Sequence, residues 1–308
     1  MDFLKERLFN KIGIEKAWTT YDAQGNACAG WGFSMTTREI SLIGQLYLNK
    51  GVWQGKRLLS EDWVTLATCR QTWSGKTPTE FQPKNDWTYG FGFNWWRCQH
   101  GCYRADGSGG QYTIVFPKHD AVLSIHADVE NMQQILDVVW THFLPVFAKD
   151  RLPDAPKAVA ELKARCASLS LKPVQGRRDG VDKSVLNRDF AFSDAPADIR
   201  GACLRESPDG WSLRLTTEAG AFDIPVGYGR WERGELKFST RNHHPLGRLI
   251  GVQRVASSAA VQKDGSVKVC VHLLDGPRRI ELTFKRSFFN SVAEGRVVGM
   301  WSFKSSRM

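Results

Sequence analysis

Three glycines in four positions make Gly107-Ser108-Gly109-Gly110 the segment of this 308-residue chain best suited to bring the backbone close to a ligand. Glycine has no side chain and adopts positive φ angles at little cost, so such a run predicts a tight turn. The residues that follow, Gln111 to Phe116, are rich in β-branched and aromatic types and predict a strand. We therefore expect a turn that feeds a strand and that a ligand approaches closely.

The segment Cys98-Gln99-His100-Gly101-Cys102 contains three side chains of the types that bind zinc. No second cluster supplies a fourth ligand at a familiar spacing, and a hairpin turn with two incidental cysteines is the more common structure for such a sequence. We predict the hairpin, and neither a metal nor another cofactor. The other histidines have ordinary explanations: solvated loop residues at His243-His244, a turn at His119, and a core or cleft-edge position at His126.

Helices and strands must position the glycine turn. The first half of the chain has sequence patterns typical of both. A capping box of Thr36 and Glu39, followed by apolar residues at helical spacing, predicts a helix from Thr37 to Asn49. Further helices are predicted at 2–9, 61–69 (with Trp63, Leu66 and Ala67 facing inward) and 132–149, with a surface loop at 71–88. Antiparallel strands are predicted at 89–96, after the turn at 99–101, at 111–116 and at 121–127.

Charge and proline divide the chain near residue 150. Residues 1–154 hold 16 basic and 16 acidic side chains and residues 155–308 hold 26 and 16, so the net charge of +10 lies wholly in the second half. Two prolines at 153 and 156 favour a linker, and many short strands with turn residues between them then predict a small antiparallel barrel or sandwich. We predict a first domain at 1–150, a helix and linker at 151–184, and a β-rich accessory domain at 185–308.

Three segments together resemble the serine hydrolases of the penicillin-binding-protein and class C β-lactamase type. They are residues 30–51, residues 53–64, and the pair Tyr89-Gly90-Phe91-Gly92-Phe93 and Gly107-Ser108-Gly109-Gly110-Gln111, and their order and spacing fit the family over residues 3–148. The second half is similar, more loosely, to a β-rich domain of some of these hydrolases. The resemblance implies an α+β fold, with an antiparallel sheet flanked by helices and then a barrel-like domain, and hydrolysis of an ester or amide through an acyl-enzyme.

The resemblance also implies roles for the glycine turn. In the family a lysine or histidine followed by Thr-Gly closes the cleft, and the next residue offers its backbone N–H to the oxyanion. Here Gln111 would donate that N–H, Gly109 and Gly110 would let substrate lie close, and Ser108 would replace the cationic or histidine side chain. A neutral hydroxyl cannot pair with a carboxylate as lysine does, which argues against recognition of a substrate carboxylate, whereas Ser108 suits an ester or amide substrate no worse.

The family's nucleophile motif, Ser-x-x-Lys, is missing from residues 1–154, and we expect its Tyr-x-Asn motif to be missing as well. A hydroxyl needs a neighbouring base to become a nucleophile, so a chain without both motifs cannot form the acyl-enzyme. We therefore expect a truncated gene product that is inactive alone. Two alternatives stay open: a non-catalytic protein that binds a ligand or partner, and one chain of a split enzyme.

Composition bears on partners and location. Seven scattered cysteines favour reduced thiols, and no apolar run reaches the roughly 20 residues that cross a bilayer, so we expect no membrane partner. The basic residues are dispersed along predicted strands, so we expect no nucleic acid. Loss of an upstream part would expose a sheet edge and favour a homo-oligomer. A chain that starts at Met1 is expected in the cytoplasm, and an exported parent stays open.

Overall fold

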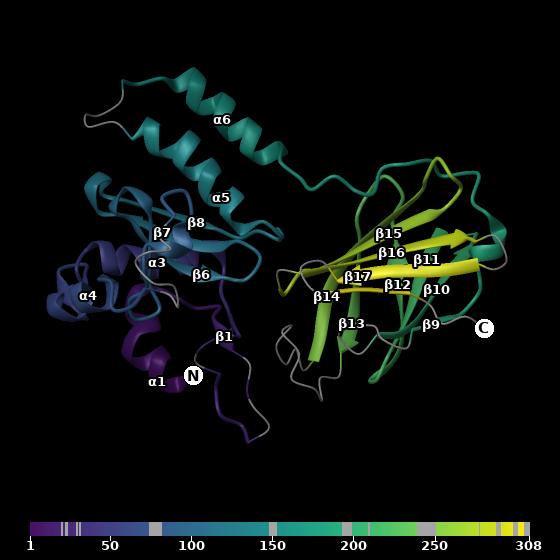
Figure 1. Cartoon of the computed structure of the whole chain (residues 1–308), viewed down its shortest axis with the longest axis horizontal. Helices are drawn as coiled ribbons and strands as arrows, with labels where there is room; N and C mark the ends of the chain where they lie inside the picture. The colour runs from purple at the N-terminus through teal and green to yellow at the C-terminus, as the bar shows by residue number, and fades with distance from the viewer. Residues whose placement is uncertain are drawn as a thin grey trace. The chain divides into compact units, whose positions relative to one another are not determined.

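A computed structural model provides the structure of the chain (Figure 1). It describes residues 1–308 except 20, 22–23, 29, 31, 74–81, 148–152, 193–198, 209, 239–250, 277, 288–290, 298–300 and 305–308. The predicted histidine pair at 243–244 lies outside the described residues. The chain divides into two compact units, Met1–Phe147 and Ala148–Met308, each with a core of its own.

Four antiparallel strands form the main sheet of the first unit. Side by side in this order lie β5 (Trp96–Arg97), β6 (Tyr103–Gly107), β7 (Gln111–Phe116) and β8 (Ala121–Ile125). Every residue of β7 after Gln111 is buried, so this strand is the centre of the unit. The strand predicted at 89–96 is shorter than expected, because Gly90 and Asn94 adopt positive φ angles of 104° and 60° that turn the chain.

Helices cover both faces of this sheet. Helix α3 (Thr37–Leu48) begins at the predicted capping box and packs on β7 and β8. A Cβ atom at Gly44 would lie only 2.5 Å from Cγ2 of Thr113, so the absence of a side chain seats this helix on the sheet. Helix α5 (Met132–Val138) continues as a π-helical turn (Val139–Phe143) and a 3₁₀ turn (Leu144–Val146), and its apolar residues share a core with the other face of β7.

Shorter elements complete the first unit. The N-terminal helix consists of α1 (Asp2–Leu4), a π turn (Lys5–Phe9) and α2 (Asn10–Ile12), and ends at Gly13 in the left-handed conformation. Helix α4 (Glu61–Thr68) is capped by Ser60, as predicted, but Trp63 and Leu66 are exposed and Val64 and Ala67 face the core. The remaining strands are β1 (Trp18–Thr19), β2 (Phe33–Ser34), β3 (Val52–Trp53) and β4 (Lys56–Arg57), and 3₁₀ turns lie at Asp86–Thr88, Gln99–Gly101 and Pro117–His119.

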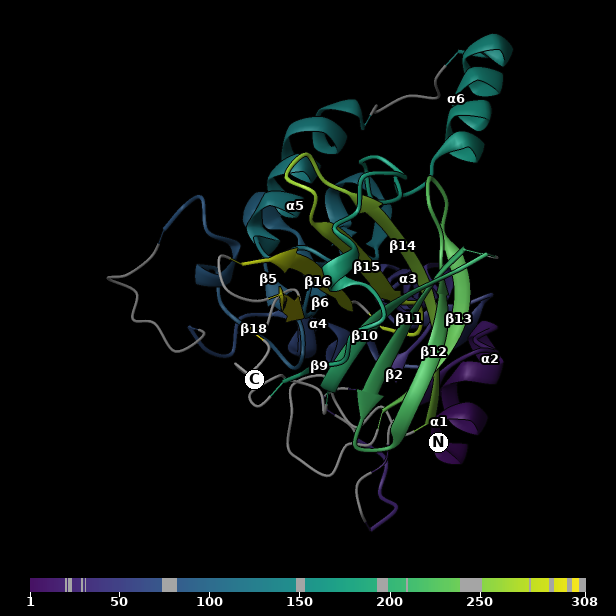
Figure 2. The same ribbon diagram turned by 90° about the vertical axis from the view of Figure 1, so that its right-hand side faces the viewer.

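The second unit begins with α6 (Pro156–Ser168) and continues with two antiparallel sheets. One sheet has the order β12-β11-β10-β9, whose strands lie side by side in Figures 1 and 2: β9 (Phe190–Ala191), β10 (Ile199–Ser207), β11 (Gly210–Thr217) and β12 (Gly220–Val226). The other runs in sequence order: β13 (Glu232–Phe238), β14 (Gly251–Val261), β15 (Val267–Leu273), β16 (Arg278–Arg286), β17 (Ser291–Val297) and β18 (Trp301–Lys304).

One apolar core lies between these two sheets. Its members alternate along the strands, as Val267, Val269 and Val271 do in β15, because successive side chains of a strand point to opposite faces. The fold is thus α+β as expected. Of the two forms predicted for the second unit, a barrel or a sandwich, the described residues form the sandwich: two separate sheets share one core without closing into a barrel. No described helix has the length and apolar character needed to cross a membrane.

Candidate functional site

The glycine turn that the sequence singled out forms the tip of the β6–β7 hairpin. Gly107, the last residue of β6, pairs with Gln111, the first residue of β7, and the three residues between them make the turn. Gly109 and Gly110 have φ angles of 86° and 87°, which favour glycine over any residue with a side chain. Ser108 is exposed at the tip, whereas the two glycines are buried.

The chain's own segment after β8 packs against this turn. The N–H of Val129 donates a hydrogen bond to the carbonyl oxygen of Gly109 at 3.0 Å, and a Cβ at Gly110 would lie 3.1 Å from Cγ2 of Val129. The side-chain amide of Gln111 donates to the carbonyl oxygen of Ser108 at 3.1 Å. These contacts fix the backbone of the turn before any ligand arrives, which is the preorganisation that an oxyanion donor requires.

A hydroxyl and an imidazole meet beside the hairpin, at the start of α3. The residue that follows β8, His126, lies with Nδ1 3.1 Å from Oγ1 of Thr37. Because Tyr112 pairs with Ile125, Gln111 and His126 are the next residues beyond that pair on neighbouring strands. Burial lowers the pKa of His126, so the imidazole is more readily neutral and can accept the hydroxyl proton of Thr37.

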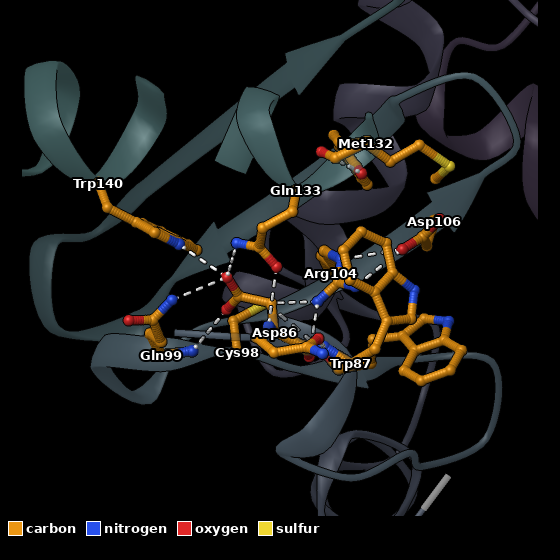
Figure 3. A network of polar contacts seen from close by, with 12 residues as sticks. Asp86, Trp87, Cys98, Gln99, Arg104, Asp106, Met132, Gln133 and Trp140 are labelled. Carbon is orange, nitrogen blue, oxygen red and sulfur yellow. Dashed lines mark hydrogen bonds and ion pairs between the residues drawn. The ribbon is translucent and has the colours of Figure 1, made fainter. Parts of the chain in front are cut away.

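The strongest polar cluster of the first unit was not found from the sequence. Figure 3 shows the Asp86 carboxylate at its centre, with side chains from three other segments pointing toward it. Asp86 is fully buried, and its Oδ2 accepts hydrogen bonds from Gln99 Nε2 (2.9 Å), Gln133 Nε2 (2.7 Å) and Trp140 Nε1 (2.9 Å). Its Oδ1 accepts from the backbone N–H of Gln99 at 2.9 Å. Four donors therefore replace the water that a buried carboxylate loses.

A buried ion pair joins this cluster to the strand that carries the glycine turn. The side chain of Arg104 is completely buried, and its Nε donates to Oδ2 of Asp106 at 3.0 Å. Its Nη2 lies 2.9 Å from the same oxygen without hydrogen-bond geometry, and its Nη1 contacts Sγ of Cys98 at 3.2 Å and the carbonyl oxygen of Asp86 at 3.4 Å. The rings of Trp87, Trp96 and Tyr112 surround the guanidinium.

This pair holds β6 immediately before its glycines. Burial raises the pKa of Asp106, and the neighbouring Arg104 guanidinium opposes that rise. Asp106 is the last residue before Gly107, so the ion pair anchors the strand one residue from the turn. The cluster of Asp86, Arg104 and Asp106 consequently positions the turn without lying in it.

The cysteines of the predicted hairpin belong to the core. Cys98 and Cys102 are buried, and burial raises the pKa of their thiols to about 11 and about 12. His100, the third residue of the candidate zinc site, packs its ring on Trp140 with centroids 5.3 Å apart. Among the described residues no group of three or more metal-ligating side chains comes together.

A Tyr-x-Asn triplet does occur in the sequence, as Tyr47-Leu48-Asn49. The expectation that the chain lacks this sequence pattern is therefore wrong. Its place in the fold differs from that of a catalytic group. The Tyr47 ring packs on Trp95 with centroids 4.5 Å apart, in a core that also contains Val115 near the far end of β7. Thr37 lies at the opposite end of the same helix, and it is this end that contacts His126.

Comparison with known proteins finds structures but no sequence relatives: no protein-family model and no curated protein matches the chain. One similar solved structure, from Bacillus anthracis, is named as a 6-aminohexanoate-dimer hydrolase. It has 22% identity and a TM-score of 0.39, over 47% of this chain and 37% of that one. Another is the octameric penicillin-binding protein homologue from Pyrococcus abyssi, with 11% identity and a TM-score of 0.35, over 99% of this chain and 59% of that one.

The match to this chain spans 37% and 59% of the lengths of the two proteins. Residues 1–308 hold no Ser-x-x-Lys.

Proposed function

We propose that the first unit forms one wall of the cleft of a β-lactamase-like serine hydrolase that cleaves an ester or amide bond through an acyl-enzyme. Gln111 donates its backbone N–H to the oxyanion, Gly109 and Gly110 shape the backbone beside the substrate, and Ser108 contacts the substrate from the exposed tip. The observation that carries the proposal is the glycine hairpin itself. Its backbone is fixed by Val129 and by the side chain of Gln111, at the place where the family's third motif falls.

The nucleophile, its lysine and a catalytic tyrosine are supplied from outside these 308 residues, so the chain alone is inactive. Without a base beside a serine the chain cannot acylate. The purified chain should therefore show no burst with an activated ester and no labelling by a fluorophosphonate or a penicillin probe. Stoichiometric labelling of a serine in this chain would overturn the proposal.

The role of Gln111 is tested once the missing part is at hand. A Ser-x-x-Lys motif is sought in the coding sequence beside this one, and the two parts are joined or co-expressed. Gln111→Pro removes the backbone N–H and should lower kcat by about 10²- to 10³-fold, the cost of losing one oxyanion donor. Gln111→Ala keeps that N–H but loses the side-chain hydrogen bond to Ser108, so as the control it should cost clearly less than Gln111→Pro. Equal loss in both variants would place the oxyanion donor elsewhere.

A further inference from the structure

A cavity of about 480 Å³ lies in the second unit, on the face of the larger sheet that points away from the apolar core. Strands β15 and β16, neighbours in Figure 1, supply Lys268, His272, Arg279 and Glu281 to its lining. These residues alternate along the strands with core residues such as Val271. The volume falls in the range of roughly 300–1,000 Å³ that small-molecule sites occupy.

The opposite wall is formed by residues 171–176, the segment that leads from α6 into the sheets. Hydrogen bonds and close packing hold this segment against the strands. The indole N–H of Trp231 donates to the carbonyl oxygen of Leu171 at 2.8 Å, and the N–H of Val174 donates to Oγ of Ser258 at 3.2 Å. A Cβ at Gly176 would lie 2.3 Å from the carbonyl oxygen of Val261, so this backbone runs directly over β14. The cavity is therefore preformed by the fold of the second unit.

The lining of the cavity is positively charged. Three basic side chains, Lys172, Lys268 and Arg279, face one acidic side chain, Glu281, which leaves a net charge of +2 (3 − 1). The carboxylate of Glu281 is also paired with a cation beyond the lining, since Nε of Arg296 lies 2.9 Å from Oε2. Two of the lining cations reach it as well: Nε of Arg279 at 3.0 Å and Nζ of Lys268 at 3.7 Å.

Glu281 remains ionised in this setting. Burial alone would raise its pKa, but the hydrogen bonds from Arg279 and Arg296 outweigh that effect, and the net result is a lowered pKa. Its single negative charge is shared among Lys268, Arg279 and Arg296, so the net charge of these four side chains is positive. An anion entering the cavity would meet a lining whose net charge is positive, inside a partly desolvated site.

An aromatic pair adds an apolar surface to the same cavity. The rings of Trp231 and His272 meet edge to face, with centroids 5.0 Å apart and an interplanar angle of 79°. The hydrogen bond from Trp231 to Leu171 and this ring contact hold the indole in one orientation. A rigid indole in a ligand-sized cavity favours a flat, apolar ligand body.

We propose that this cavity is a binding site for a small organic anion in which a carboxylate or phosphate group stands beside a flat apolar ring system. The anionic group pairs with the Lys268 and Arg279 side of the cavity, and the ring packs on the Trp231 side. The site goes beyond the hydrolase function and does not depend on it, because every residue that lines the cavity belongs to the second unit.

Calorimetric titration of the full chain tests the proposal with three probes of the same shape: 2-naphthoate, 2-naphthyl phosphate and the uncharged 2-naphthamide. At least one anion should bind about tenfold or more tightly than the amide, with an affinity that falls as salt is added. The two anions distinguish a carboxylate ligand from a phosphate ligand. Failure of both anions to bind, or equal binding of the amide, would overturn the proposal.

A pair of charge-matched variants locates the binding site. Lys268→Gln should weaken binding of the preferred anion by about three- to tenfold, because one lining cation is lost. Lys237→Gln removes the same charge from an exposed position on β13, outside the cavity, and should leave binding within about twofold. Equal weakening in both variants would mean that only the net charge of the unit matters, and would refute the site. If Lys268→Gln does not fold, the comparison of anion and amide on the natural chain decides.

Discussion

Both units have apolar cores, but the first unit adds a buried network of charged and polar side chains. Beneath its sheet, the first unit buries a carboxylate with four donors, and an Arg–Asp pair among aromatic rings. The second unit has a core of aliphatic and aromatic side chains between two sheets, and its ion pairs lie on the outside. A buried polar network depends on every partner being present, whereas apolar burial is the sum of many small contributions.

The two units should therefore tolerate different substitutions. Loss of one polar group in the first unit leaves several buried donors unsatisfied, and the cost falls on segments far apart in the chain. Loss of one apolar side chain in the second unit leaves a cavity beside neighbours that can partly relax. The following predictions test that contrast, with each unit's unfolding free energy measured separately by site-resolved hydrogen exchange at β7 and β15.

The largest effect is expected at the centre of the polar network. Asp86→Ala should destabilise the first unit by about 4 kcal/mol, because the amides of Gln99 and Gln133 and the indole N–H of Trp140 lose a buried acceptor. Asp137→Ala is the matched control, since Asp137 accepts from the same Gln133 amide at 3.0 Å but is exposed. If the two variants lose similar amounts of unfolding free energy, the buried carboxylate stabilises the first unit no more than the exposed one does.

The second unit should lose somewhat less from its own best-buried positions. Leu282→Ala, in the middle of β16, is expected to cost about 3 kcal/mol through lost burial and the cavity that remains. Exchange at β7 should not change, because Leu282 lies in the core of the other unit. A loss at β7 as large as that at β15 would show that the two units unfold together.

Acid should act on the first unit through the capping box of α3. Burial opposes ionisation of Glu39, but backbone N–H groups of Thr36, Lys16 and Glu15 donate to its carboxylate and lower its pKa to about 2. Because the folded pKa lies below the ordinary value of 4.5, this stabilisation is complete above about pH 4.5 and is lost as the pH falls toward 2.

Glu39→Gln should accordingly cost the first unit about 2 kcal/mol at pH 7 and flatten its stability between pH 4.5 and 2. The exposed Glu6 offers a control of the same type, Glu6→Gln, for which no such flattening is expected. An unchanged pH profile in Glu39→Gln would assign the acid sensitivity of the first unit to other carboxylates.

The smallest effect is expected for an ion pair on the surface of the second unit. Arg254 donates to Asp275 through Nε at 3.0 Å, but its side chain is 69% exposed. Arg254→Met should change the stability at β15 by less than about 1 kcal/mol, and less still in high salt, because water screens the pair. A loss of several kcal/mol of unfolding free energy would mean that polar contacts make large contributions to the stability of both units.

Much of the fold could be predicted from local sequence signals. The capping box placed the start of α3 at Thr37, and Ser60 placed the start of α4, because an N-cap acts within one helical turn. The glycine hairpin was also predictable, since positive φ at Gly109 and Gly110 is a property of the residue type. These are interactions between residues close in sequence.

The polar network could not be predicted because its partners are distant in sequence. Asp86 lies 47 residues from Gln133 and 54 from Trp140, and it belongs to a segment with the polar, proline-containing composition of a surface loop. The sequence could not decide between a barrel and a sandwich for a related reason. Short strands with regular turns fit an open pair of sheets as well as a closed one, and closure depends on pairing between strands that local patterns do not specify.

The buried thiols give the molecule its own reporters of local opening. Buried thiols are Cys98 and Cys102 in the first unit and Cys203 and Cys270 in the second, whereas Cys69 and Cys166 are exposed. A thiol-modifying reagent would reach the exposed pair at once and the buried ones only when their unit opens, at a rate that follows that opening. The natural chain thus has buried thiols in both units. Their rates of modification would compare how often each unit opens, and no label has to be introduced.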